Sequence, residues 1–236
     1  MIGSILSPFR AITLAALAAG LVACSSGTRG GAQTTPTPAA APSAAASQGQ
    51  AAAIAKARAD SARYPYTEAD IHFMTGMIAH HAQAIKMAGW AGSHGAGASV
   101  KTLCDRIINA QQDEITNMQR WLRDRRQPVP EPNPNGMKMV MNGAEHDMLM
   151  PGMLSAEQMK QLDEARGPEF DRLFLTFMIQ HHNGAVAMVK ELFDTYGAGQ
   201  DELVFKFASD VNVDQTTEIA RMERMLFALT VERRAQ

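Results

Sequence analysis

The sequence predicts an all-α fold, a four-helix bundle made of two duplicated helix hairpins that a long Met-rich connection joins. The stretch from Met77 to Ala88 returns from Met178 to Val189, at a shift of 178 − 77 = 101 residues, and both copies keep the pattern M-I-x-H-H-x-x-A-[IV]-x-M. Apolar residues recur in each copy at the spacing of an amphipathic helix. Such self-similarity indicates an internal duplication, and no strand pattern competes with it.

The first 63 residues predict a leader and a tether. Residues 1–23 carry Arg10 before an apolar run that is shorter than the roughly 20 residues of a membrane span. The Leu-Val-Ala that precedes Cys24 resembles a bacterial lipobox, so Cys24 is the expected lipidation site. The alternative is an ordinary signal peptide with a chance cysteine. Residues 24–63 are rich in Ala, Pro and Ser, which predicts a flexible, disordered tether.

The bundle domain is expected over residues 64–236. Thr67, followed by acidic residues, predicts a capped helix start, and Gly-rich or Pro-rich segments predict the helix ends. The expected helices are 68–91, 99–125, a short one over 155–165, 168–196 and 201–232.

Each repeat carries two neighbouring histidines, which point in different directions on a helix. His81 and His182 fall near the middle of the apolar face, whereas His80 and His181 fall at its edge. We therefore expect the first pair to point inward and the second pair to lie at the flank.

The second and fourth helices place polar residues in their inward stripes, Gln111 and Glu114 in one and Gln215 and Glu218 in the other. A polar group in a bundle core needs a partner, because an unpaired one costs about 1–3 kcal/mol. Two interpretations stay open. Each Glu either locks its hairpin by accepting a hydrogen bond from the inward histidine, or orients that imidazole toward a metal ion or binds the ion itself.

Residues 133–154 form the Met-rich connection. Thioether sulfur is soft and neutral, so it suits Cu(I) or Ag(I) and is a poor ligand for harder cations. Alternating methionines would share one side of an extended backbone. The alternative is an apolar lid packed over the bundle. The candidate metal ligands in this segment are Met137, Met139, Met141, His146, Met148, Met150 and Met153.

Several other sites are disfavoured. The chain contains no Glu-x-x-His, which argues against a di-iron carboxylate centre, and no Cys-x-x-Cys-His, which excludes c-type haem. A b-type haem stays open. The formal charge of −2 and the lack of a basic patch beyond Arg120–Arg126, interpreted as a solvated helix end, predict no nucleic-acid partner. Cys104 lies on an apolar stripe and is expected to be a buried structural thiol rather than a ligand.

Three segments together resemble the bacterial family named domain of unknown function 305. They are D-x-x-F-x-x-x-M-I-x-H-H-x-Q-A-I-x-M-A, M-P-G-M-L-S and F-D-x-x-F-L-x-x-M-I-x-H-H-x-G-A-V-x-M, and the resemblance covers about residues 64–228. It implies a ferritin-like four-helix fold and a secreted or lipid-anchored protein associated with copper, in which His and Met bind Cu(I) or Ag(I). The residues at family motif positions are His80, His81, His181, His182, Met77, Met87, Met178, Met188, Met150 and Met153.

The sequence therefore predicts a lipoprotein that binds copper, with Cu(I) favoured, and that acts in copper sequestration, transfer or tolerance and not as an enzyme. Its expected partners are the metal ion and, through the anchor, a membrane. The periplasmic face of the outer membrane is favoured, because Ser25 rather than Asp follows the cysteine. The alternatives are a structural or protein-interaction bundle without metal and a ferritin-like redox enzyme. The sequence leaves a homodimer open.

Overall fold

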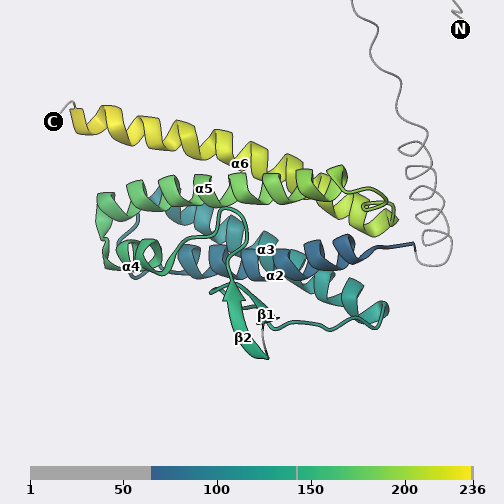
Figure 1. Cartoon of the computed structure of the whole chain (residues 1–236). Helices are drawn as coiled ribbons and strands as arrows, with labels where there is room; N and C mark the ends of the chain where they lie inside the picture. The colour runs from purple at the N-terminus through teal and green to yellow at the C-terminus, as the bar shows by residue number, and fades with distance from the viewer. Residues whose placement is uncertain (1–64, 142, 235–236) are drawn as a thin grey trace, which may run out of the picture. The chain divides into compact units, whose positions relative to one another are not determined.

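The computed structural model describes residues 65–141 and 143–234, which contain five helices and one hairpin (Figure 1). The elements are α2 (Glu68–Gly89), α3 (Ala98–Asp124), β1 (Met137–Met141), β2 (Ala144–Met148), α4 (Ala156–Glu164), α5 (Gly167–Asp194) and α6 (Glu202–Arg234). The predicted leader, Cys24 and the tether lie outside the described residues. No helix in the described ranges combines the length and the apolar character that crossing a membrane requires.

The four long helices form two hairpins, α2 with α3 and α5 with α6, and the hairpins pack together through α2 and α5. The predicted all-α architecture and the duplication are thus confirmed. Thr67 caps α2, since its side chain accepts a hydrogen bond from the N–H of Asp70 while the Asp70 carboxylate accepts one from the N–H of Thr67. Ser155 and Gln158 cap α4 in the same way.

A pair of equivalent aspartates ties the two hairpins together. Asp70 in α2 accepts a hydrogen bond of 2.7 Å from the N–H of Gly199, in the loop between α5 and α6. Asp171, 101 residues later in α5, accepts hydrogen bonds of 3.0 and 3.2 Å from the N–H of Gly97, in the loop between α2 and α3. Burial raises the pKa of Asp171, and the bond from Gly97 opposes that shift. Each hairpin therefore holds the loop of the other.

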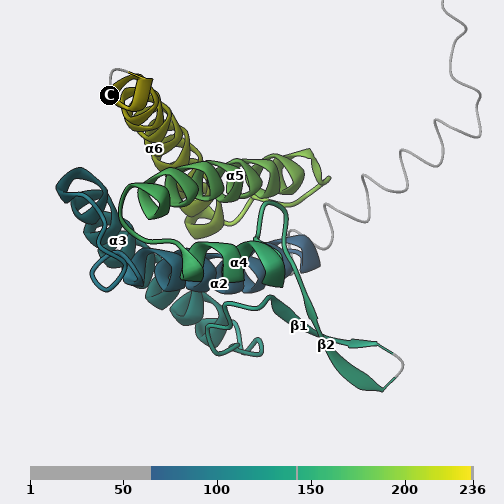
Figure 2. The same ribbon diagram turned by 90° about the vertical axis from the view of Figure 1, so that its left-hand side faces the viewer.

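The Met-rich connection contains a β-hairpin, so the expectation that no strand would form was wrong there. Strands β1 and β2 pair antiparallel, with Met137 opposite Met148 and Met139 opposite His146. The two residues between the strands in the sequence are Asn142 and Gly143, and Gly143 has a φ of 79°. Asn-Gly is a strong hairpin signal because both central positions of the turn require positive φ. The hairpin projects away from the helices in Figure 2.

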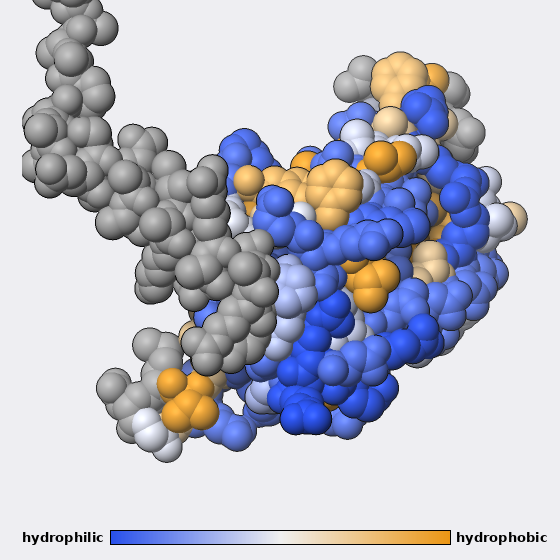
Figure 3. All heavy atoms as spheres, turned by 90° about the vertical axis from the view of Figure 1, so that its right-hand side faces the viewer, coloured by the Kyte–Doolittle hydropathy of each residue, from blue (hydrophilic) through white to orange (hydrophobic). Residues whose placement is uncertain are grey.

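Two apolar clusters fill the interior. The first cluster lies around α2, α5 and the Met-rich connection and includes Phe73 and Met77. The second cluster includes Phe170 and Phe174 of α5. Cys104 is buried in the second cluster, as predicted, and burial raises the pKa of its thiol to about 12. The face seen in Figure 3 is mostly hydrophilic, with separate apolar patches.

The basic end of α3 is only partly solvated, which corrects the expectation for Arg125. The Arg125 guanidinium bonds the Asp201 carboxylate at 2.5 Å and lies over the Trp121 ring. Asp201 also accepts a hydrogen bond of 3.0 Å from the Trp121 indole and bonds from the first N–H groups of α6. This contact fixes the start of α6 against α3.

Candidate metal site

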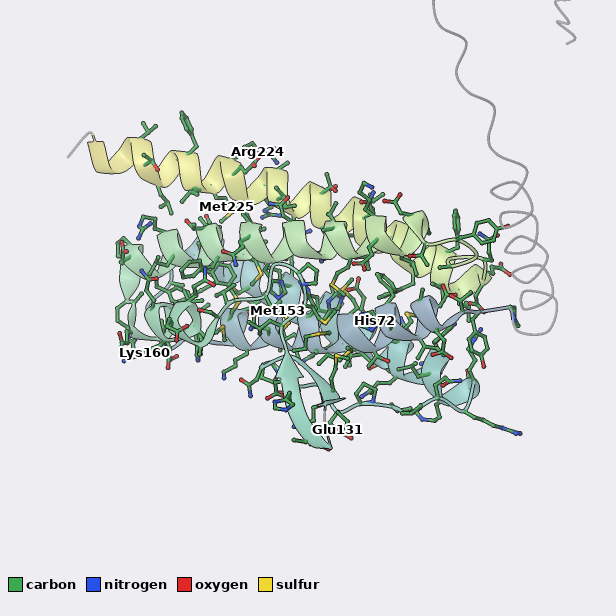
Figure 4. All side chains as sticks on the ribbon, in the orientation of Figure 1. His72, Glu131, Met153, Lys160, Arg224 and Met225 are labelled. Atoms are coloured by element: carbon green, nitrogen blue, oxygen red, sulfur yellow. The ribbon has the colours of Figure 1, made fainter. Side chains whose placement is uncertain are left out.

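The segment Met150–Leu154, called the strap below, crosses over α2 and α5. The Pro151 carbonyl lies 3.0 Å from Nε2 of His80 in α2. On the α5 side, the Gln180 side-chain amide donates a 3.2 Å hydrogen bond to the Gly152 carbonyl. Figure 4 labels Met153 of the strap, between the ribbons of α2 and α5. The strap thus covers the region where the two duplicated helices meet.

Two glycines allow the strap to approach the helices this closely. A Cβ built on Gly184 of α5 would lie 2.0 Å from the Pro151 oxygen and 2.5 Å from the Gly152 Cα. A Cβ on Gly76 of α2 would lie 3.0 Å from the end of the Met150 side chain. The helices are therefore shaped to receive this segment.

His80 and His181 face each other beneath the strap. Their ring centroids are 3.8 Å apart, and the two residues are 1% and 0% exposed. The expectation that this pair would lie at the flank was wrong. The edge of each apolar face becomes interior because α2 packs on α5 and the strap closes the remaining side.

The other pair of histidines points toward the outer helices. Nε2 of His81 lies 2.5 Å from Oε2 of Glu114 in α3, and Nε2 of His182 lies 2.8 Å from Oε2 of Glu218 in α6. Both imidazoles are fully buried, as expected. An ionised carboxylate only accepts hydrogen bonds, so each Nε2 carries the proton and, in the neutral ring, each Nδ1 keeps a free lone pair.

Five buried imidazole nitrogens have no hydrogen-bond partner in the part of the chain that the structure describes. They are Nδ1 of His80, His81 and His182 and both ring nitrogens of His181. Burial, followed by the charge that His81 would carry, lowers the pKa of His80 to about 3. Burial, followed by the neighbouring His80, lowers the pKa of His181 well below its ordinary value. The rings of His80 and His181 are therefore neutral near pH 7, and neutral imidazole is the form that binds metals.

Five of the methionines predicted as metal ligands lie in the first apolar cluster, the one that includes Phe73. Met77 lies one turn before the histidines of α2, and the Met150 N–H lies 3.3 Å from the sulfur of Met153 within the strap. Met150 and Met188 both lie against Gly76. The methionines of this cluster are Met77, Met137, Met150, Met153 and Met188. Met87 and Met178 belong instead to the second cluster.

The hairpin places four of the candidate metal ligands on one face. Cross-strand pairing and the alternation of side chains place Met137, Met139, His146 and Met148 on the same side. Met139 and Met148 are half-buried against the first cluster, whereas His146 is exposed. The backbone of Met141 ends β1, and its side chain lies outside the described ones.

Comparison with known proteins identifies the family of this chain. The family model of the domain of unknown function DUF305 matches residues 70–226. The chain belongs to the DUF305 family. No curated protein matches it.

Solved structures of DUF305 proteins align with this chain. A DUF305 protein from Streptomyces coelicolor, considered to be secreted, is 26% identical with a TM-score of 0.57, over 69% of this chain and 94% of that one. A DUF305 fragment from Deinococcus radiodurans is 29% identical with a TM-score of 0.57, over 69% and 98%. CopM in its Cu(II)-bound form is 28% identical with a TM-score of 0.52, over 67% and 96%.

This DUF305 chain has no ready-made cluster of three or more His, Cys, Asp or Glu side chains able to hold a metal ion within its described residues. A metal bound near the histidines would therefore need further donors, and methionine sulfur is one that the first apolar cluster offers. A donor set of neutral imidazole nitrogen and thioether sulfur fits copper and especially Cu(I).

Sequence reasoning missed the residues that hold the strap in this DUF305 chain. The buried Gln83 amide donates 3.1 Å hydrogen bonds to the carbonyls of Pro134 and Leu154, and its oxygen accepts one of 2.6 Å from the Leu154 N–H. Gly184 occupies the equivalent position of the second repeat. A glycine inside a helix is unfavourable, so Gly76 and Gly184 were the available signals of a close backbone approach.

Proposed function

We propose that this protein binds copper, as Cu(I), in the buried site that the four histidines and the adjacent methionines form beneath the strap. The observation that carries the proposal is the set of five buried imidazole nitrogens without partners. An unpaired buried polar atom costs about 1–3 kcal/mol, so such a group in a core calls for a binding role.

The chemistry of the donors favours Cu(I). Imidazole nitrogen and thioether sulfur are neutral, and thioethers select soft ions. A monovalent ion is also less costly to bury among neutral donors than a divalent one. Similarity to CopM, solved in a Cu(II)-bound form, supports copper as the metal. Glu114 and Glu218 would orient His81 and His182 from outside the site, in the way that carboxylates commonly orient metal-binding histidines.

The role that fits such a buried site is sequestration, transfer or tolerance rather than catalysis. A metal enclosed by core side chains and a strap lacks the open coordination position that a catalytic metal keeps for its substrate. The hairpin face with Met139, His146 and Met148 is suited to capture the ion first. The lipobox resemblance at Cys24 favours a lipid-anchored protein on the periplasmic face of the outer membrane.

The test is an anaerobic titration of the purified full-length protein with Cu(I) against a chromophoric chelator, comparing His181→Leu with His94→Leu. Neither ring nitrogen of His181 has a hydrogen-bond partner within the described part of the chain. His94 is also buried, but its nitrogens contact Ser93 at 2.8 Å and the carbonyl and carboxylate of Asp163 at 2.9 and 3.0 Å. The two variants therefore separate a binding histidine from a structural one.

We expect His181→Leu to keep or raise the stability of the metal-free protein and to weaken Cu(I) binding by at least about tenfold. His94→Leu should do the reverse, losing stability by about 1–3 kcal/mol and keeping its Cu(I) affinity. Wild-type Cu(I) affinity in His181→Leu would refute the proposed site.

The His–Glu hydrogen bonds specifically favour a second candidate function, a structural or protein-interaction bundle without metal. In that case His81 and His182 only lock α2 to α3 and α5 to α6. This candidate predicts that the wild-type protein shows no Cu(I) binding that depends on His or Met. The same titration therefore decides between the two functions.

A further inference from the structure

A small pocket of about 50 Å³ opens at the surface where α2, α5 and the start of the strap meet. Its lining includes the exposed His72 of α2, which Figure 4 labels, and the exposed Glu191 of α5. The buried Met150 and Met188 line it as well. Pockets for organic ligands hold about 300–1,000 Å³, whereas one water takes about 30 Å³. The pocket therefore has room for an ion and a water but not for an organic substrate.

The pocket lies in line with the buried histidines. His72, Gly76 and His80 form one stripe of α2, because residues four apart lie one above the other on a helix. Along the helix axis, Gly76 is about 6 Å and His80 about 12 Å from His72. A Cβ built on Gly76 would lie 3.4 Å from the Met150 sulfur and 3.5 Å from the terminal methyl of Met188. Two thioether side chains therefore lie over the middle of the stripe, between a surface imidazole and a buried one.

The duplication does not account for His72. The equivalent residue of the second repeat is Leu173, at a shift of 173 − 72 = 101 residues, and it is a buried core residue. His72 is instead exposed, so packing does not require it. Glu191 places a carboxylate at the same pocket, and its negative charge attracts cations. The position of His72 calls for an explanation outside the repeat.

We propose that this pocket is the entrance through which Cu(I) reaches the buried site, with His72 as its first ligand there and Met150 and Met188 as the next. The inference rests on the proposed function. Imidazole and thioether both bind Cu(I), so the ion exchanges one donor for the next and never lies unliganded in an apolar interior, where a bare charge is costly. Capture on the hairpin is a separate step, because no residue of β1 after Lys138 or of β2 lines this pocket.

The experiment compares His72→Leu with His72→Met in the full-length protein, loaded anaerobically with one equivalent of Cu(I). Leucine and methionine have similar volume and apolar character, but only methionine supplies a soft donor. Titration against a chromophoric chelator gives the Cu(I) affinity. Stopped-flow mixing of the loaded protein with excess chelator gives the rate of Cu(I) release. A residue that acts only at the entrance changes entry and release together and leaves the affinity unchanged, because the affinity is the ratio of the two rates.

We expect His72→Leu to release Cu(I) about tenfold more slowly than the wild type at equal affinity, and His72→Met to release it at the wild-type rate. Both variants should melt at the wild-type temperature, because His72 is exposed.

Equal release rates for the two variants would overturn the entrance even if the wild type binds Cu(I) tightly. So would a lower affinity in His72→Leu, since His72 would then be a ligand of the stored ion. A wild-type protein without Cu(I) binding that depends on His or Met would instead refute the copper proposal, and the entrance with it.

Discussion

At the scale of single residues, the two repeats differ most informatively where the strap crosses them. Gln83 and Gly184 occupy equivalent positions, since 184 − 83 = 101. Gln83 anchors the end of the strap with two hydrogen bonds to the backbone of Leu154. Gly184 instead removes a side chain so that Pro151 and Gly152 can lie directly on α5. A single strap over a duplicated pair of helices requires one copy to hold it and the other to make room.

Gly184→Ala should therefore displace the strap. The added Cβ would meet backbone atoms at 2.0 and 2.5 Å, and backbone cannot swing aside as the end of a side chain can. We expect a loss of about 1–3 kcal/mol in the free energy of unfolding, the usual cost of overpacking, together with weaker Cu(I) binding. Urea unfolding measures the first effect and the chelator titration the second.

The matched control is Gly89→Ala at the exposed end of α2, where an added Cβ has no atom within 4 Å. Alanine should keep or raise stability there, because it favours helix more than glycine does. Equal unfolding midpoints for the two variants would show that the strap does not lie on Gly184.

At the scale of elements, the helices were predictable and the hairpin was not recognised. The helix boundaries follow from local signals, such as Thr67 before α2, Ser155 before α4 and the glycines between paired helices. The alternating methionines correctly indicated that one side of an extended segment would carry sulfur. The Asn-Gly dipeptide between the two strands was the missed signal, and β2 has a polar, exposed sequence that resembles a loop.

The hairpin provides a test of whether its methionines capture metal or only pack. Met139→Leu/Met148→Leu keeps apolar volume against the first cluster and removes two thioethers. We expect stability to change by less than about 1.5 kcal/mol, while the number of Cu(I) ions bound per chain falls and the tightest site persists. Equilibrium dialysis followed by metal analysis measures the stoichiometry.

Met159→Leu is the matched control for this test, because Met159 is half-buried on α4 and packs against the second cluster. It should lose neither copper nor stability. If the hairpin variant binds as many Cu(I) ions as this control, the hairpin methionines act as an apolar lid only.

At the scale of the whole molecule, the candidate site depends on packing that no single helix reveals. A wheel for α2 places His80 at the edge of its apolar face, and a wheel for α5 does the same for His181. Only the packing of α2 on α5, closed by the strap, turns both edges into interior. The pairing of His81 with Glu114 and of His182 with Glu218 was predictable, because the inward stripes already placed these residue types in one core.

The buried histidines make the stability of the metal-free protein depend on pH. The pKa of His80 is lowered to about 3 and that of His181 is lowered well below the ordinary value of 6.5, with burial as the main cause of both shifts. Below pH 6.5 the unfolded chain takes up protons at these residues and the folded protein does not. Their contribution to stability is therefore complete above about pH 6.5 and is lost progressively as the pH falls from there toward 3.

Two such histidines give a slope of up to about 2.7 kcal/mol per pH unit once the unfolded rings are protonated. Urea unfolding of the metal-free protein at pH 7.5, 6.5 and 5.5 measures this slope, and His181→Leu should reduce it by up to about 1.4 kcal/mol per pH unit. Other groups contribute to the total slope, but they are common to both proteins, so the difference isolates His181. An identical slope in the variant would mean that His181 takes up its proton at the same pH in the folded and the unfolded protein, which would contradict its lowered pKa.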